Sequence, residues 1–141
     1  MTAAGDGGRP KVRRLQPLRV LLSGHDRRFL RVTSFLLSRR GYAVVDAGTD
    51  DPARAADRER ADVVLLEPDG SRAAAARTVA ALQALPRAPA ILLAVDDGER
   101  GRWEGVPTVL KWAPLETLAE EIEAASRRRV APLSGAAGTL H

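Results

Sequence analysis

The chain has 141 residues, of which 45% are hydrophobic and 28% are charged. This is the composition of a single globular domain. It contains no cysteine, which excludes disulfide frameworks, thiolate zinc sites and cysteine nucleophiles. With two histidines in the whole chain, we expect no metal site and no other cofactor. No apolar run is long enough to cross a bilayer, and residues 1–14 lack the apolar stretch of a secretory signal. The sequence therefore predicts a cytoplasmic protein with no membrane contact.

The net charge of +4 is unevenly distributed. Residues 1–17, 18–41 and 126–141 are basic, whereas residues 42–125 are acidic. The candidate basic patch consists of Arg27, Arg28, Arg31, Arg39 and Arg40. Such a patch can meet an acidic protein, nucleic acid or an anionic membrane, or it can be ordinary solvated charge. No aromatic interleaving, helix-turn-helix or zinc finger accompanies it, so nucleic-acid contact is expected to be at most weak and non-specific.

The chain begins with a segment, 1–17, that is rich in glycine, proline and basic residues and has no apolar period. We expect it to be a disordered lead-in. The apolar run 18–22 predicts a buried strand, which ends at Ser23 and Gly24. Asp26 can cap a helix over 27–40, which Gly41 would end. Spacing of three and four residues predicts that this helix turns one face inward, made of Phe29, Val32, Phe35 and Leu36.

Strands and helices then alternate along the chain. Strands are predicted over 42–46, 62–66, 90–95 and 106–110, with helices over 52–60 and 71–85 and a last helix from about 115 to 126. The segment 96–105 is too short and polar for a full helix. Residues 127–141 are expected to form a flexible tail.

This alternation predicts an α/β fold over residues 18–126: a flavodoxin-like (βα)5, doubly wound parallel sheet with order 2-1-3-4-5 and a shortened or missing fourth helix. In such sheets, ligands bind at the carboxyl ends of the strands.

Three stretches carry a resemblance to a known family. They are Leu18 to Val45, the run Ala61 to Glu67, and the run Val106 to Lys111. With them the chain resembles the CheY-like receiver domains of response regulators. The resemblance implies a phospho-accepting aspartate after the third strand, a magnesium-binding pair of acids after the first, and a lysine after the fifth.

The chain departs from this pattern at nearly every reactive position. The acid pair falls on Gly24 and His25, the phospho-acceptor on Glu67, the serine or threonine position on Ala94, and the aromatic switch on Thr108. Lys111 is kept, and Trp112 replaces the proline that usually follows it. Phosphoryl transfer needs a metal to neutralise the phosphate oxygens, and Mg²⁺ prefers carboxylate ligands. These departures predict a degenerate pseudo-receiver that forms no acyl phosphate and has no catalytic residue.

Glu67 and Lys111 allow two interpretations. A glutamate carries its charge further out than an aspartate, so it could partly mimic a phosphoaspartate and hold one conformation. Alternatively, the two residues form a structural ion pair at the sheet edge. Both interpretations predict that Glu67 and Lys111 touch.

The tryptophans and the histidine also have alternative interpretations. Trp103 and Trp112 are predicted to lie on one candidate partner face, where they could anchor a partner, or each could cover the core where a helix is missing. His25 could form a proton-linked or metal site, or it could be an ordinary loop residue. It lies too close in sequence to Ser23 to serve that hydroxyl easily as a base, so we predict no hydrolase.

The sequence therefore predicts a phosphorylation-independent interaction module in signal transduction or transcriptional regulation. Its expected partner is a signalling or regulatory protein, with a homodimer as a further candidate. The alternative is a small-ligand sensor that uses the emptied phospho-acceptor pocket.

Overall fold

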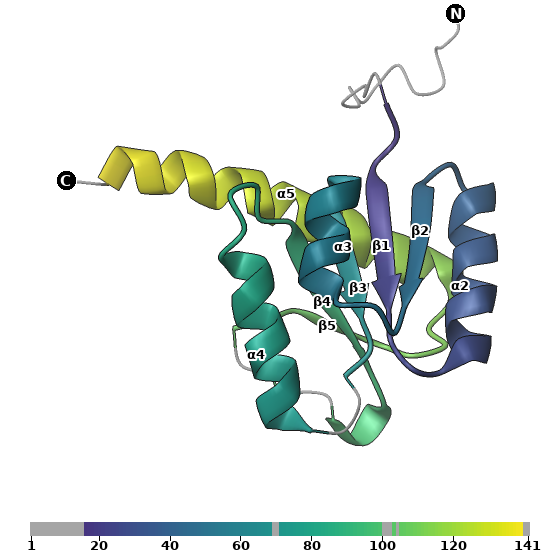
Figure 1. The fold of residues 1–141 in the computed structure, drawn as a ribbon. Helices are drawn as coiled ribbons and strands as arrows, with labels where there is room; N and C mark the ends of the chain where they lie inside the picture. Colours follow the sequence, from purple (N-terminus) through teal and green to yellow (C-terminus); the bar gives the residue numbers. More distant parts are fainter. Residues whose placement is uncertain (1–15, 69–70, 100–102, 104, 140–141) are drawn as a thin grey trace, which may run out of the picture.

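A computed structural model describes residues 16–68, 71–99, 103 and 105–139 of the chain. Its core is one five-stranded parallel sheet with the order β2-β1-β3-β4-β5, as the sequence predicts (Figure 1). The strands are β1 Arg19–Ser23, β2 Ala43–Gly48, β3 Val63–Leu66, β4 Ala90–Val95 and β5 Thr108–Leu110. The helices are α2 Arg27–Arg39, α3 Pro52–Glu59, α4 Arg72–Gln83 and α5 Leu115–Thr139. Of the predicted lead-in 1–17, residues 1–15 lie outside the described part.

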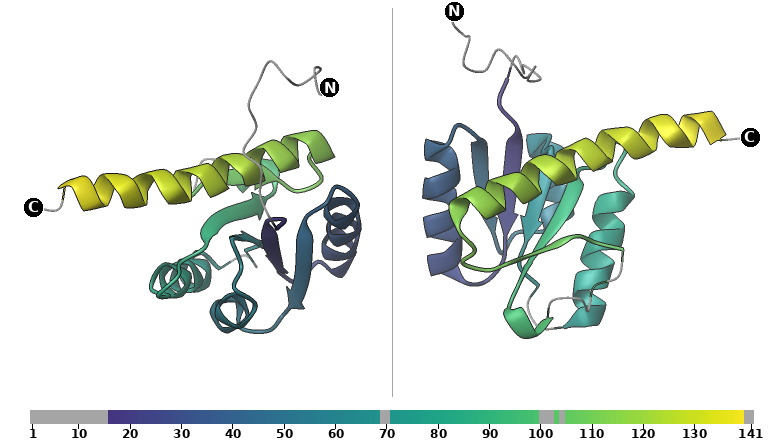
Figure 2. Two further views of the ribbon diagram at one scale, coloured as in Figure 1. Left: turned by 90° about the horizontal axis from the view of Figure 1, so that it is seen from above. Right: turned by 180° about the vertical axis from the view of Figure 1, so that it is seen from behind.

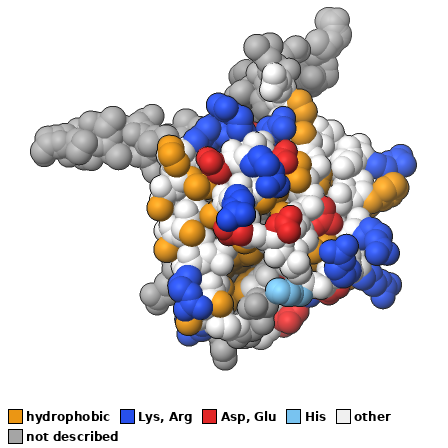
Figure 3. Space-filling view, viewed as in Figure 1, with side chains coloured by type: hydrophobic (Ala, Val, Ile, Leu, Met, Phe, Trp, Pro, Cys, Tyr) orange, Lys and Arg blue, Asp and Glu red, His pale blue; other side chains and the backbone are white. Residues whose placement is uncertain are grey.

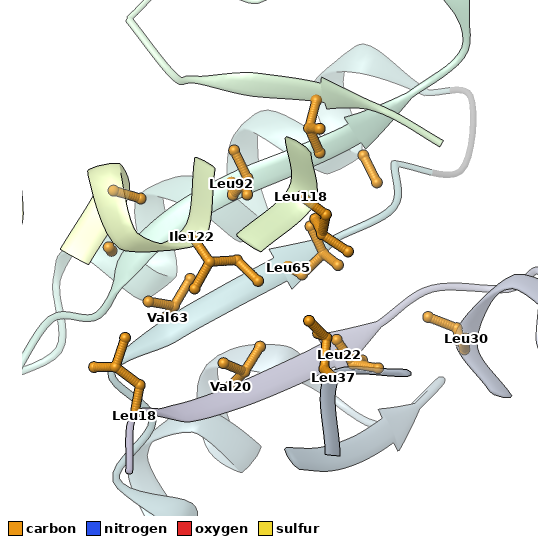
Figure 4. Packing of buried hydrophobic residues seen from close by; sticks show 14 of the residues in the cluster. Leu18, Val20, Leu22, Leu30, Leu37, Val63, Leu65, Leu92, Leu118 and Ile122 are labelled. Atoms are coloured by element: carbon orange, nitrogen blue, oxygen red, sulfur yellow. The ribbon is translucent and has the colours of Figure 1, made fainter. Parts of the chain in front are cut away.

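Helices cover both faces of the sheet (Figures 1 and 2). On one face, α2 and α5 enclose a cluster that includes Leu22, Leu65, Leu92 and Ile122 (Figure 4). On the other face, α3 and α4 cover a second cluster. All residues of β3 and β4 are buried, because these central strands are covered on both sides.

Between β4 and β5 the described residues hold a short 3-10 helix, Asp97–Glu99, where the receiver pattern has its fourth helix. This confirms the predicted loss. Trp103 and Val106 pack against the second cluster in this region. They cover part of the sheet face that a full helix would have covered.

The predicted inward face of α2 is wrong at three of its four positions. Phe29 is buried as predicted, together with Leu30, Thr33 and Leu37. The other three predicted residues, Val32, Phe35 and Leu36, are exposed by 37%, 58% and 37%. The helix has two apolar faces. The face that packs against the sheet includes Thr33, which hydropathy alone would not place in the core.

The last helix runs further than the sequence predicts. α5 continues to Thr139, through the segment expected to be a flexible tail from residue 127, and projects past the sheet (Figure 2). Alanine and leucine are strong helix formers, and residues 130–139 contain several of them. The same segment contains Pro132 and two glycines, which disfavour a helix interior, so local preference alone does not account for the extension.

Asp62, immediately before β3, joins three separate parts of the chain. Its carboxylate accepts hydrogen bonds from the backbone N–H of Arg19 at 2.8 Å, from the Arg87 guanidinium at 2.9 Å and from the Arg129 guanidinium at 3.4 Å. These donors belong to β1, to the loop before β4 and to α5. The arrangement fixes the amino-terminal edge of the sheet, opposite the edge where the candidate site lies.

Candidate functional site

The carboxyl edge of the sheet brings Glu67 and Lys111 together. Glu67 follows β3 and Lys111 follows β5, and these strands flank β4. The Lys111 ammonium donates to Glu67 Oε2 at 2.8 Å and to Asp26 Oδ2 at 2.9 Å. The predicted contact of Glu67 with Lys111 is therefore present. Asp26, which the sequence predicts to cap the following helix, is a third member of this group.

Asp26 has both roles at once. Its Oδ1 accepts from the backbone N–H of Phe29 at 3.1 Å, which caps α2, while its Oδ2 accepts from Lys111. A cap residue directly after β1 necessarily lies at the carboxyl edge of the sheet. That position was the signal available in the sequence.

The remaining oxygen of Glu67 binds the loop between β1 and α2. Glu67 Oε1 accepts from the backbone N–H groups of His25 and Asp26, both at 2.9 Å. Hydrogen bonds to a carboxylate are shorter and stronger than neutral ones. Each oxygen of Glu67 thus has at least one donor, and the carboxylate ties the β1–α2 loop to the lysine after β5.

Gly24 makes this arrangement possible. A Cβ atom built at Gly24 would lie 2.7 Å from the Cβ and 3.3 Å from the Cδ of Glu67. The first distance is well inside ordinary carbon–carbon contact, which is roughly 3.5–4 Å. Position 24 therefore has no room for an aspartate while Glu67 keeps its place.

The charges at this edge stabilise each other. Burial opposes the charged form of Lys111, but hydrogen bonds to Glu67 and Asp26 outweigh it and raise the lysine pKa above 10.5. The hydrogen bond from Lys111 is the largest of the effects that lower the pKa of Asp26 below 3.8. The Lys111 ammonium also lies 5.4 Å from the centre of the Phe29 ring. The single ammonium group of Lys111 thus forms ion pairs with two carboxylates and a cation–π contact with an aromatic ring.

The residues at this edge do not fit the magnesium ion that the receiver resemblance implies. Gly24 supplies no ligand, His25 is exposed, and the ammonium of Lys111 already engages both nearby carboxylates. Across the described ranges, no three His, Cys, Asp or Glu side chains are grouped so that they could hold a metal. The donor set is that of an internal ion-pair network.

The other predicted pocket residues do not join this network. Ala94 is fully buried in the core cluster beneath the α2 and α5 face. Thr108 is half-buried at the start of β5, paired with Leu93. Neither adds a hydrogen bond to the Glu67–Lys111 pair among the described residues.

A small hollow of about 130 Å³ lies beside the network, between the ends of β1 and β3 and the starts of α3 and α4. Gly24, His25 and Glu67 line it, and Lys111 does not. The residues that the sequence assigned to one emptied pocket are therefore divided between the hollow, the ion pair and the core.

The two tryptophans lie in different surroundings. Trp103 is half-buried against the cluster on the α3 and α4 face, with the Arg72 guanidinium 5.6 Å from its ring centre. Its indole N–H is buried with no partner among the described atoms. Trp112 is 53% exposed and meets the Phe29 ring edge-to-face at 5.3 Å. The prediction of one partner face is therefore wrong: Trp103 packs on the α3 and α4 side of the sheet, whereas Trp112 lies exposed beside α2 on the other side.

All five arginines of the predicted basic patch are exposed along α2 and its carboxyl end. Arg40 forms two hydrogen bonds with the Glu116 carboxylate, at 2.6 and 3.0 Å. These bonds raise the pKa of Arg40 and lower that of Glu116. The patch is thus partly an intramolecular link between α2 and α5.

Comparison with known proteins agrees with this architecture. A response regulator from Desulfuromonas acetoxidans superimposes with a TM-score of 0.65 at 13% identity, over 78% of this chain and 97% of that one. The chain has the receiver fold. The receiver domain of the hybrid histidine kinase CckA matches at a TM-score of 0.56 and 18% identity, over 77% and 98% of the two chains. A response regulator receiver domain protein from Bacillus halodurans matches at 0.53 and 16%, over 78% and 97%.

Sequence comparison adds no closer relative, since no family model and no curated protein matches the chain. The receiver fold is thus evident from the structure at identities that leave the function open. Within the described ranges, no helix combines the length and apolar character that a membrane span requires.

Proposed function

We propose that the protein is a phosphorylation-independent pseudo-receiver that acts as a protein-interaction module in signal transduction or transcriptional regulation. The observation that carries this proposal is the Glu67 carboxylate, bound on one oxygen by the β1–α2 loop and on the other by Lys111. We assign the domain no enzymatic activity.

The chemistry at Glu67 supports the proposal. A phospho-acceptor must present a free carboxylate oxygen to a phosphorus atom beside a metal ion. Here both oxygens accept hydrogen bonds from groups of the protein itself. The close approach of Gly24 to Glu67 also leaves no space for one of the two acids that would hold the metal.

The same contacts give the domain a fixed conformation. Glu67 connects β3 to the β1–α2 loop, and Lys111 connects it to the end of β5. A charge that is built into the sequence cannot be added or removed by a kinase or phosphatase. We infer that partner binding, rather than phosphorylation, determines the output of the domain.

The ligand-sensor alternative has less support. An anionic ligand in the emptied pocket could pair with Lys111, yet Lys111 already has two carboxylate partners. The adjacent hollow of about 130 Å³ is smaller than the roughly 300–1,000 Å³ of typical ligand sites. We therefore retain the interaction module as the proposed function.

The test is phosphorylation chemistry on the full chain. The protein is incubated with Mg²⁺ and acetyl phosphate and its intact mass is measured, and its melting temperature is measured with Mg²⁺ and beryllofluoride. A receiver with the complete acidic pocket serves as the positive control in the same mixtures. We expect no adduct and no thermal shift. A metal-dependent adduct, or a shift that Glu67→Gln removes, would overturn the proposal.

A further inference from the structure

The large hydrophobic side chains that are exposed gather on one side of the molecule. Among the described residues they are Val32, Phe35 and Leu36 on α2, and Trp112, which is 53% exposed. Trp112 belongs with the others because its ring contacts Phe29, one turn before Val32. Large apolar groups gathered in this way on a protein surface mark interaction sites, whereas single exposed ones do not.

Two arginines border these apolar groups. The Arg28 guanidinium lies 6.0 Å from the centre of the Trp112 ring, and that of Arg39 lies 5.6 Å from the centre of the Phe35 ring. We define the α2 face as the following six residues: Arg28, Val32, Phe35, Leu36, Arg39 and Trp112. A guanidinium above a ring keeps its outer edge available for a carboxylate.

The charge of α2 has a single sign. Residues 27–40 contain five arginines and no acidic residue. Arg40 is neutralised by Glu116, while the structure gives Arg27, Arg28, Arg31 and Arg39 no ion pair among the described residues. Figure 3 shows basic side chains above and below a hydrophobic one along the right-hand side, where α2 lies.

We propose that the α2 face binds a short amphipathic helix of a partner protein, whose apolar side chains are flanked by aspartate or glutamate. The proposal rests on the proposed function and specifies its partner. Arg28 and Arg39 are eleven positions apart, which is about 16 Å along a helix. A partner helix of about three turns with apolar residues at i, i+3, i+4 and i+7 matches this length. Its carboxylates would pair with the two arginines.

Two other occupants fit less well. A second copy of the chain would bring two arginine-bearing helices together, and like charges at an interface are unfavourable. A membrane would have to admit the apolar side chains to a depth of roughly 5–10 Å. Here guanidinium groups lie over both rings, so insertion would also take two charged groups out of water.

The test begins with an unbiased selection on the full chain. A phage-displayed library of random peptides of about 16 residues, some four turns of helix, is selected on the immobilised protein. The same library is selected on the variant Phe35→Ser/Leu36→Ser. We expect the wild type alone to enrich peptides that combine helical apolar spacing with acidic residues. Trp112 fluorescence should shift to shorter wavelength when such a peptide binds.

The affinity of the enriched peptide for charge-reversal variants of the protein then tests whether the two arginines contribute to binding. Arg28→Glu/Arg39→Glu should weaken binding about tenfold or more. The matched control, Arg54→Glu, reverses an exposed arginine on α3 and should leave the affinity unchanged. Circular dichroism and melting temperature confirm that every variant is folded, as expected for exposed positions.

Several results would overturn the proposal. These are no enrichment over background, enrichment that persists on the Phe35→Ser/Leu36→Ser variant, or an equal loss with Arg54→Glu. Binding to vesicles of equal parts phosphatidylglycerol and phosphatidylcholine that depends on Phe35 would assign the face to membranes instead. Dimerisation that Phe35→Ser abolishes would assign it to a second copy. None of these results involves acetyl phosphate, so failure here is distinguishable from failure of the pseudo-receiver proposal.

Discussion

The substitution Gly24→Ala tests whether the β1–α2 loop is as close to Glu67 as the structure places it. The added methyl group would lie 2.7 Å from the Glu67 Cβ. Excess atoms in a packed site typically cost about 1–3 kcal/mol. If Glu67 moves away instead, it loses hydrogen bonds to its charged carboxylate, each with a net contribution of about 1.5–3 kcal/mol to stability. We expect a loss of about 3 kcal/mol in the free energy of unfolding, which lowers the melting temperature by about 12 °C.

Urea denaturation and thermal melting followed by circular dichroism measure this loss. The matched control is Gly98→Ala, since a Cβ built at Gly98 meets no atom within 4 Å. In a Glu67→Gly background the obstructing side chain is gone, so Gly24→Ala should then cost less than about 1 kcal/mol. If Gly24→Ala is no worse than Gly98→Ala, or is equally harmful in both backgrounds, the close approach of Gly24 to Glu67 is refuted.

Three further predictions follow from the contacts described above. Replacing Lys111 by methionine should lower the melting temperature at pH 7. Because its carboxylate partners raise the pKa of Lys111, the stabilisation is fully present below the ordinary lysine pKa and is lost as the pH rises through the raised pKa. The difference in melting temperature between wild type and variant should therefore narrow in strongly alkaline melts. Phe29→Ala should cost about 3–5 kcal/mol in urea denaturation because Phe29 is buried, whereas Phe35→Ser should leave the midpoint nearly unchanged; the reverse order would contradict the placement of α2. Glu116→Gln should lower the melting temperature slightly, and because the pair with Arg40 is exposed, 1 M salt should abolish the difference; a difference that persists in salt would argue against an exposed ion pair.

The strand order and the edge where Glu67 and Lys111 meet could be predicted from the sequence. Parallel strands that are buried on both faces can be recognised in a sequence as short, continuous apolar runs, such as Val63–Leu66. Right-handed crossovers then leave few possible orders, and the carboxyl ends of β3 and β5 fall at one edge.

The orientation of α2 could not be predicted in the same way. Its apolar residues satisfy helical spacing for more than one face, and hydropathy selects Phe35 over Thr33. The face of α2 that packs against the sheet is the one whose side chains fit between the neighbouring elements. Thr33 belongs to that face and is only 4% exposed. Periodicity thus predicted the helix, while the choice of face depended on the packing of the assembled layers.

The geometry around Glu67 also exceeded what spacing can show. The sequence indicated that an acid pair was missing, with Gly24 at one of its positions. It could not show whether an acid is simply absent at position 24 or whether the structure has no room for one there. The distance from Gly24 to the Glu67 Cβ distinguishes the two cases. Likewise, the second role of Asp26 depends on the reach of Lys111 across the sheet edge.

The carboxylate of Asp62 has a consequence for local unfolding. Through Arg19, Arg87 and Arg129 it joins β1, the loop before β4 and α5, which lie far apart along the chain. Segments that share such a connection tend to open together as one cooperative unit. Hydrogen exchange followed by mass spectrometry should therefore show β1 and the first half of α5 becoming labelled at a common rate. In Asp62→Ala, the amides of α5 should exchange faster than those of β1, because α5 can then open without the sheet.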